Sequence, residues 1–335
     1  MLTKEANERL TQVGMGTPMG ALLRRYWHPV ATLPELLSEP VLAVTVLGEN
    51  LALYRTEAGD MGLVAQRCPH RGASLAYGIP EADGLRCAYH GWKFDGRGTC
   101  LEQPAEPADS TFKDRVRVPA YPVQEMGGLI WAYLGPTPAP LLPRFDLFEY
   151  GIVKRRLWVG DSEDSDEWQV GHPILFPNIL SVGDGGRSQF QIRVPIDDTH
   201  TYHVWYRTKP RAEKTPLQDP ASIPVLDYAY KHEDGRLVVD TVSGQDMMVW
   251  VTQGPISDRT TERLGTTDKG VIMYRALLEE QMLKVERGEE PMAVVRDPAK
   301  NTPMIDIARE RNPFQVSRAD VDMFALRKEV LATSR

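Results

Sequence analysis

The sequence lacks several features by which common protein classes are recognised. It has only three cysteines, which are too few for a disulfide framework. Its formal net charge is −7 and it has no long run of lysine or arginine, so binding to the phosphate backbone of nucleic acids is not expected as a main activity. No stretch approaches the ~20 apolar residues that cross a bilayer, and the N-terminus has no apolar segment of signal-peptide length. We therefore expect a cytoplasmic protein whose thiols are reduced.

A dinucleotide-binding fingerprint is also missing. No G-x-G-x-x-G motif follows a strand and opens a helix, so the chain is not expected to oxidise NADH by itself. The 335 residues, of which 42% are hydrophobic, are enough for two globular domains. A redox activity would therefore need electrons from another protein.

Two of the three cysteines each stand shortly before a histidine. The order is Cys68-x-His70, then sixteen residues, then Cys87-x2-His90. Zinc fingers usually pair cysteine with cysteine and histidine with histidine, so structural zinc is the less favoured alternative. One sulfur and one nitrogen from each half suit a Rieske [2Fe–2S] centre, in which two histidines replace two cysteines on one iron. The third cysteine, Cys100, is expected to be a small buried apolar residue.

The residues around these ligands sharpen the interpretation. Cys68-Pro-His-Arg-Gly72 and Cys87-Ala-Tyr-His-Gly-Trp92 resemble the Rieske domains of aromatic-ring-hydroxylating oxygenases. The resemblance implies that the two cysteines hold the ferric iron and the two histidines hold the iron that is reduced. Gly20–Val30 is similar to the N-terminal segment of that family, which makes His28 a packed structural residue.

Apolar runs with turn residues between them predict a small antiparallel β-sandwich around the cluster. Val41–Leu47 and Leu51–Tyr54 are rich in β-formers and are separated by Gly48-Glu-Asn, which predicts a hairpin. Gly128–Leu134 reads as a closing strand. A proline-rich seam follows, so we place residues 1–140 in the Rieske domain and 141–335 in a second, catalytic domain.

The second domain is predicted to be α+β. Gln189–Ile196 and Thr199–Arg207 alternate between apolar and polar residues, as half-buried strands do. Asp268–Arg287 carries an apolar stripe at helical spacing.

From Tyr150 to Gly288 the chain resembles the phthalate-dioxygenase-type Rieske non-haem iron oxygenases. The resemblance implies a helix-grip (START-like) catalytic fold and an oxygenase (alpha) subunit that hydroxylates or O-/N-dealkylates an aromatic compound, such as an aromatic acid or aryl ether. It also implies a mononuclear Fe(II), a separate flavin or iron–sulfur NAD(P)H reductase, O₂ and a homotrimer. The matching pieces are Gly171–Pro173, Phe176–Asn178, Pro195–Thr201, Gly244–Asp246, Gln253-Gly254 and Asp258-Arg259.

One part of the family pattern has no counterpart. Asp246 matches the carboxylate ligand of the mononuclear iron, and Gly244 predicts a sharp backbone turn just before its helix. A helix-capping or surface aspartate is the alternative. The two histidines that complete the family's iron site are expected between Phe148 and Glu149, where the sequence has none.

Asp197, His200 and His203 do not replace the missing pair, because residues three apart on a strand point to opposite faces. His200 is expected to be structural. Asn178 and His203 are candidate substrate contacts, with strand-end hydrogen bonding and core packing as the alternatives.

Two explanations of the gap remain open. Either the sequence omits a segment that carries the two histidines, or the protein has lost its oxygen-activating centre. We favour the first, because a site that had lost two ligands would have no reason to keep the third. The second would leave a Rieske electron carrier fused to a ligand-binding domain without oxygen-activating iron. The sequence does not name the substrate.

Overall fold

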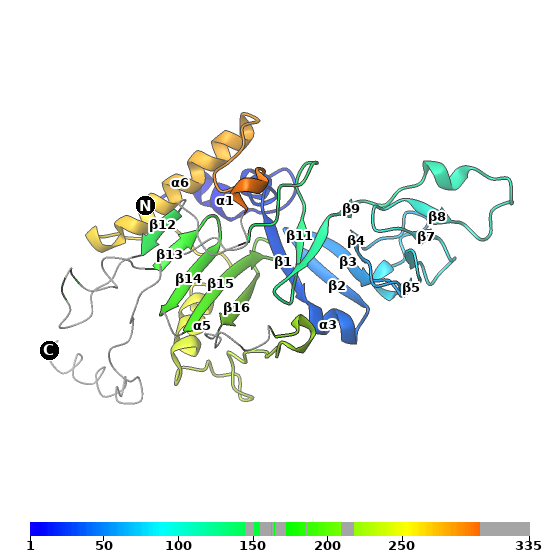
Figure 1. Cartoon of the computed structure of the whole chain (residues 1–335). Coiled ribbons are helices and arrows are strands. Elements are labelled where there is room, and N and C mark those ends of the chain that lie inside the picture. The colour runs from blue at the N-terminus through cyan, green and yellow to red at the C-terminus, as the bar shows by residue number, and fades with distance from the viewer. Residues whose placement is uncertain are drawn as a thin grey trace. The chain divides into compact units, whose positions relative to one another are not determined.

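The structure is a computed structural model that describes residues 1–144, 151–154, 162, 164, 172–184, 187–208 and 218–301. Contacts divide the chain into two compact units. One comprises Met1–Arg144, Arg193–His203 and Pro216–Pro303, and the other comprises the remaining segments. This division by contacts differs from a division by sequence, so the boundary after residue 140 stays a prediction. The expected α+β class is confirmed, with mixed helices and antiparallel sheets (Figure 1).

A four-stranded antiparallel sheet forms one layer of the first unit. Its order is β2-β3-β4-β9, and the predicted hairpin is present as β2 and β3, with a tighter turn than expected. Leu47 and Gly48 connect the strands with φ values of 50° and 77°. Positive φ at both central residues gives the turn the same twist as the flanking strands, so two residues are enough to connect β2 and β3. The strands are Val41–Val46 (β2), Glu49–Arg55 (β3), Met61–Ala65 (β4) and Ala120–Tyr121 (β9).

A second sheet of the same unit contains the predicted closing strand. β11 (Leu129–Tyr133) lies between β1 (Trp27–Thr32) and β10 (Val123–Met126), and all five of its residues are buried. His28 on β1 is fully buried, and its Nε2 lies 2.8 Å from the carbonyl oxygen of Leu23. Burial lowers the pKa of His28 to about 4, so the imidazole is neutral. The structural role predicted for His28 is confirmed.

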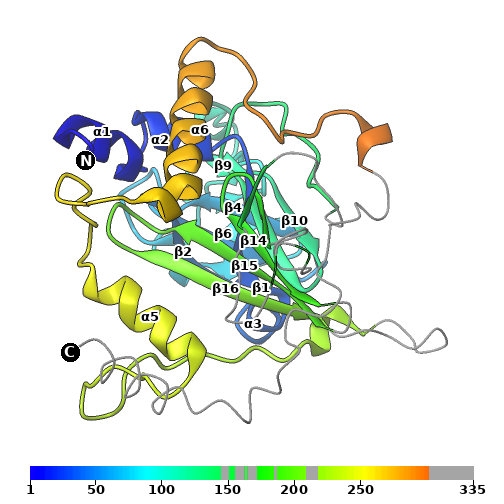
Figure 2. The ribbon, with the colours of Figure 1, turned by 90° about the vertical axis from the view of Figure 1, so that its left-hand side faces the viewer.

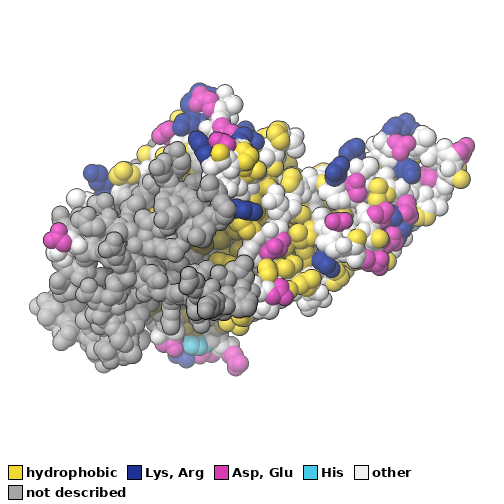
Figure 3. Space-filling view, viewed as in Figure 1, with side chains coloured by type: hydrophobic (Ala, Val, Ile, Leu, Met, Phe, Trp, Pro, Cys, Tyr) yellow, Lys and Arg dark blue, Asp and Glu magenta, His cyan; other side chains and the backbone are white. Residues whose placement is uncertain are grey.

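Four very short strands carry the cysteine loops. They are Ile79–Pro80 (β5), Leu85–Arg86 (β6), Lys93–Phe94 (β7) and Cys100–Glu102 (β8), paired in that order. Their apolar side chains join a core that includes Tyr54, Leu85 and Phe94 together with all three cysteines. Cys100 is 3% exposed, as expected of a small buried residue. In the view of Figure 3, acidic and basic side chains are interspersed over this end of the unit, so this face has no single-sign charge.

The last sheet has five strands in sequence order, from β12 to β16 (Figure 1), and Figure 2 shows β14, β15 and β16 side by side. The predicted strands are present as β15 (Arg187–Pro195) and β16 (Thr201–Thr208), and the predicted long helix as α6 (Lys269–Glu286). None of the described helices is long and apolar enough to cross a membrane. The other elements are β12 (Gly151–Lys154), β13 (His172–Leu175), β14 (Ile179–Asp184), α1 (Lys4–Thr11), α2 (Pro18–Leu23), α3 (Leu33–Ser38) and α5 (Val242–Thr252).

Candidate functional site

Two loops of nearly the same backbone design bring the four predicted cluster ligands together. The amide of Cys68 donates to the carbonyl of Ala73 at 2.8 Å, and that of Cys87 donates to the carbonyl of Trp92 at 2.8 Å. In the opposite direction, the amide of the glycine four residues after each cysteine donates to the cysteine carbonyl, at 2.9 and 3.0 Å. These two glycines, Gly72 and Gly91, have φ values of 75° and 74°. Glycine adopts this left-handed conformation without steric cost, which lets both loops close tightly.

The side chains of the loops separate into a sulfur pair and a nitrogen pair. Cys68 and Cys87 are each 2% exposed and close enough for their thiols to hydrogen-bond. The rings of His70 and His90 have centroids 4.6 Å apart. The thiols face the protein interior, whereas His70 is exposed and His90 half-buried. The two kinds of ligand are therefore sorted, with sulfur inside and nitrogen at the surface.

The pKa shifts of the site have clear physical causes. Burial raises the pKa of the Cys68 thiol to about 11, although backbone N–H groups of His70 and Arg71 oppose the shift. Bound metal would hold such thiols as thiolates, and the N–H groups would then stabilise the negative sulfur. Desolvation and the neighbouring His70 and Arg71 lower the pKa of His90. The lowered pKa favours the neutral imidazole, which is the form that binds metal.

This pairwise arrangement fits a two-iron cluster better than a single zinc ion. Among the residues that the structure describes, no group of three or more His, Cys, Asp or Glu side chains converges on one point, as a zinc site would require. In a Rieske cluster each iron takes only two protein ligands and completes its coordination with inorganic sulfide. Cys68 and Cys87 would hold one iron and His70 and His90 the other. The sequence prediction of these four ligands fits the geometry.

An aromatic side chain lies against each of the two imidazoles. Trp92 is buried and stacks on His70, with ring centroids 4.4 Å apart and planes 7° apart. Tyr89 is exposed and lies against His90 at 3.7 Å, under the guanidinium of Arg71. The stacked contact on His70 and the tilted contact on His90 restrict the rotation of both imidazoles.

The helix that carries Asp246 differs from the sequence prediction. α5 begins at Val242, capped by the Thr241 hydroxyl, which accepts from the amide of Gly244 at 3.0 Å. Gly244 is thus inside the first helical turn and not at a sharp bend before the helix. Its lack of a side chain serves packing, because a Cβ would lie 2.6 Å from the carbonyl oxygen of Val238. Asp246 follows within the helix, so it is not the helix cap, and it is exposed, as the alternative of a surface aspartate expects.

A cation and several aromatic rings lie on the same side of α5 as Asp246. Trp250 stands one turn further along the helix, its ring stacked on that of His203 at 4.9 Å. The guanidinium of Arg193 lies over the Trp250 ring at 5.4 Å. Burial lowers the pKa of Arg193, and the nearby Tyr274 and Asp246 oppose that shift. Burial and the Arg193 charge lower the pKa of His203 to about 4, so His203 is neutral beside a cation.

Arg193 and Trp250 were missed by the sequence analysis. The alternation of the strand places Arg193 on its polar face, which normally faces water. Packing of α5 against that face could not be read from either segment alone. The sequence did carry one signal for this contact. An arginine stands among apolar residues in one segment and a tryptophan in the other, and such a pair can form a cation–π contact.

The remaining candidates are less closely connected to this group. Asn178 is half-buried in the turn between β13 and β14. His200 is 70% exposed and its Nδ1 lies 3.0 Å from Oδ1 of Asp197, in the turn before β16. The turn is held by amides of residues 199 and 200 donating to the same Asp197 oxygen. This arrangement fits the structural role predicted for His200.

The donors for a mononuclear iron are incomplete in this chain. All seven histidines lie in the described residues. His70 and His90 belong to the cluster cage, His28 is buried against a backbone carbonyl, and no two of the others converge with Asp246 in a group of three. Phe148 and Glu149, between which the missing pair is expected, lie outside the described residues. The residues present supply one candidate ligand, so we derive no chemical step through this iron.

Comparison with known families and proteins agrees with the geometry. Residues 26–122 match the Rieske [2Fe-2S] domain, and residues 232–307 match the family described as LigXa C-terminal domain like. The 5,5'-dehydrodivanillate O-demethylase oxygenase subunit of Sphingobium sp. is 38% identical over 90% of this chain and 85% of its own length. The 3-chlorobenzoate-3,4-dioxygenase oxygenase subunit of Comamonas testosteroni is 36% identical over 60% of this chain and 54% of its own length.

The alignment with the demethylase subunit also bears on the missing histidines. It runs over 367 positions, whereas 90% of 335 residues is only about 300. The relative therefore carries tens of residues that have no counterpart in this chain. Such a deficit is in keeping with the gap noticed in the sequence.

A likeness to solved structures supports the fold. NdmB of Pseudomonas putida CBB5 matches with a TM-score of 0.56 at 20% identity, over 79% of this chain and 93% of that one. The demethylase oxygenase subunit, at 38% identity, is matched over 85% of its own length, which favours an oxygenase over a simple electron carrier. With a match to the Rieske [2Fe-2S] domain and a relative of this identity and coverage, the chain belongs to the family of oxygenase subunits of Rieske non-haem iron oxygenases.

Proposed function

We propose that this chain is the oxygenase component of a system that uses O₂ and electrons from a separate NAD(P)H reductase to hydroxylate or O-/N-dealkylate an aromatic compound. The observation that carries the proposal is the cage of Cys68, His70, Cys87 and His90. Its histidine side is at the surface and its cysteine side is buried, so an electron can enter and leave through the imidazoles. A homotrimer is part of the proposal, as the family resemblance implies.

An aromatic acid is the substrate class that the second region supports best. Arg193 supplies a guanidinium, which is a permanent cation in proteins and binds carboxylates through two parallel hydrogen bonds. Trp250 and His203 place aromatic planes beside that charge. The two relatives are named for dehydrodivanillate and 3-chlorobenzoate, which are aromatic carboxylates. His203 and Asn178 remain proposed substrate contacts.

The mononuclear iron of the family needs two histidines that this chain does not supply. We infer that they belong to the segment present in the relatives and absent here, and that Asp246 is the carboxylate that completes their site. The family's carboxylate position is retained on a regular helix, which supports this inference. Bound iron with open positions supplies O₂ activation in such sites.

The test of the function has two steps. First, the purified chain is mixed with NADH, with and without a flavoprotein reductase, and the Rieske absorption is followed. We expect bleaching only with the reductase. Second, aromatic acids and aryl ethers are screened for product under O₂, with the chain as it is and with the relatives' segment inserted between Phe148 and Glu149. Product from the segment-bearing chain supports the oxygenase. Cluster reduction without product in either form would favour the electron carrier.

A further inference from the structure

An arginine directly precedes each of the two cluster cysteines, and the two arginines make equivalent contacts. Nη1 of Arg67 donates to the carbonyl of Gly72 at 3.5 Å, and Nη1 of Arg86 donates to the carbonyl of Gly91 at 2.7 Å. In both loops the acceptor is the glycine that closes the turn. The approximate symmetry of the two loops therefore includes these side chains.

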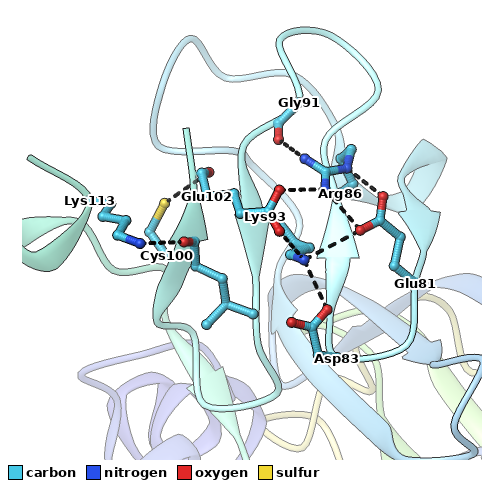
Figure 4. Close-up of polar contacts among 9 residues, drawn as sticks. Glu81, Asp83, Arg86, Gly91, Lys93, Cys100, Glu102 and Lys113 are labelled. Carbon is cyan, nitrogen blue, oxygen red and sulfur yellow. Dashed lines mark hydrogen bonds and ion pairs between the residues drawn. The ribbon is translucent and has the colours of Figure 1, made fainter. Parts of the chain in front are cut away.

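The two arginines differ greatly in how firmly other residues hold them. Arg67 is exposed, and its single long bond to Gly72 is weak. Arg86 is half-buried and also donates to both carboxylate oxygens of Glu81, at 2.5 and 2.9 Å, and to Glu102 at 2.7 Å (Figure 4). A guanidinium held by several charge-assisted bonds keeps one orientation. Only the second loop is thus braced by its arginine.

A buried lysine holds the carboxylates that hold Arg86. The Lys93 side chain is only 7% exposed, and its ammonium pairs with Glu102, with Asp83 at 3.0 Å and with Glu81 at 3.4 Å. Lys93 is on β7 and Glu102 on β8, so the sheet itself fixes the distances between the charges. Arg86 therefore makes its contact with Gly91 from a rigid frame.

The bond from Arg86 to Gly91 affects the cluster ligands because of where Gly91 lies in the loop. Gly91 stands between the ligand His90 and Trp92, whose ring stacks on His70. Its amide closes the turn back to the carbonyl of Cys87. Holding the Gly91 carbonyl fixes the peptide unit that joins it to Trp92, and with it the backbone that orients both imidazoles.

We propose that Arg86 is the positioning residue of the iron–sulfur centre. Through the Gly91 carbonyl it sets the orientation of His90 directly and that of His70 by way of Trp92. Glu81 and Glu102 act as its brace. Arg67, in the equivalent position of the first loop, has no such role, because its bond is long and exposed.

Four variants separate positioning from general stabilisation. Arg86→Gln removes the bond to Gly91, and Arg67→Gln is the matched control in the other loop. Lys93→Met weakens the same charge network but leaves Arg86 in contact with Gly91. Arg86→Lys keeps the charge without the planar fork that reaches the carbonyl and both carboxylates together. Each protein is compared by circular dichroism, iron and sulfide content, electron paramagnetic resonance, midpoint potential and rate of cluster loss to a chelator.

The expected result is specific to Arg86. Arg86→Gln should retain its secondary structure, show shifted g values and a shifted midpoint potential, and lose its cluster about 10-fold faster or more. Arg86→Lys should change in the same direction by less. Arg67→Gln should match the unaltered protein, and Lys93→Met should lower thermal stability with a smaller spectral change.

Either of two outcomes would overturn the proposal. In the first, Arg86→Gln, or Arg86→Lys where the glutamine variant does not fold, gives the g values and potential of the unaltered protein. In the second, Lys93→Met shifts the signal as far as Arg86→Gln, which would assign the effect to the charge network instead of the Gly91 contact.

Discussion

The cluster cage and the Asp246 region are built from very different lengths of chain. All four cage ligands lie between residues 68 and 90, in two loops joined by short paired strands. The group around Asp246 draws Arg193 from β15, His203 from β16 and Tyr274 from α6. A site made from local loops stays complete when a distant segment is absent. A site made from several distant elements loses part of its ligand set when one of them is missing.

The largest effect is expected in the cage. Replacing His70 or His90 by Cys should abolish the low-g electron paramagnetic resonance of the reduced Rieske centre or convert it toward that of a ferredoxin, since the ligand type sets the electronic structure. His232→Ala, in an exposed turn, is the control and should leave the spectrum unchanged. A colourless protein with stoichiometric zinc and no sulfide would refute the cluster.

The next effect concerns iron beyond the cluster. The chain as it is should contain two irons and two sulfides per molecule, because one carboxylate alone binds iron weakly. With the relatives' segment inserted, a third iron is expected, and Asp246→Ala should remove it while leaving the Rieske spectrum intact. Asp240→Ala, an exposed carboxylate before α5, is the control. A third iron that survives Asp246→Ala would show that the carboxylate ligand has been misassigned.

A smaller effect is expected on substrate affinity. Arg193→Gln should weaken binding of an aromatic acid by about 10- to 100-fold, since a charged hydrogen-bonding group contributes roughly 1.5–3 kcal/mol. Binding of a neutral aryl ether should change little. Arg207→Gln, an exposed arginine on β16, provides the control in titration calorimetry. Equal losses for acid and ether would argue against a carboxylate contact at Arg193.

The smallest effect is a dependence of stability on pH to which two desolvated histidines, His28 on β1 and His203 in the Asp246 region, contribute. Burial lowers the pKa of His28 and of His203 from 6.5 to about 4. As the pH falls, the unfolded chain therefore protonates each of these histidines before the folded chain does. The stability that each neutral imidazole contributes is fully present above pH 6.5 and is lost as the pH falls toward 4. Each should add about 1.4 kcal/mol per pH unit to the slope within that window.

Chemical denaturation across that pH range tests this expectation. The slope of the unfolding free energy against pH reports how many more protons the unfolded chain binds. His28→Gln and His203→Gln should each reduce this number by up to one, and the double variant by up to two. An unchanged slope in His28→Gln would mean that His28 is not buried in its neutral form.

The sequence by itself determined the local parts of this protein. The spacing of Cys68, His70, Cys87 and His90 predicted the cage, because ligands on short tight loops need few long-range contacts to converge. Alternation predicted the strands at 189–196 and 199–207, and the apolar stripe predicted the helix at 268–287. The family resemblance of the N-terminal segment implied the packed role of His28, and the burial of Cys100 was expected of a small apolar residue.

Tertiary structure alone decided which side chains that are far apart in the sequence come into contact. Arg193, assigned by alternation to the polar face of its strand, lies over Trp250 because α5 packs there. Gly244, read as a bend before the helix, lies within its first turn, since the Thr241 hydroxyl caps the helix earlier. The brace of Arg86 by Glu81 and Glu102 depends on the pairing of β5 to β8. Periodicity reports one element at a time, whereas these contacts depend on how separate elements pack.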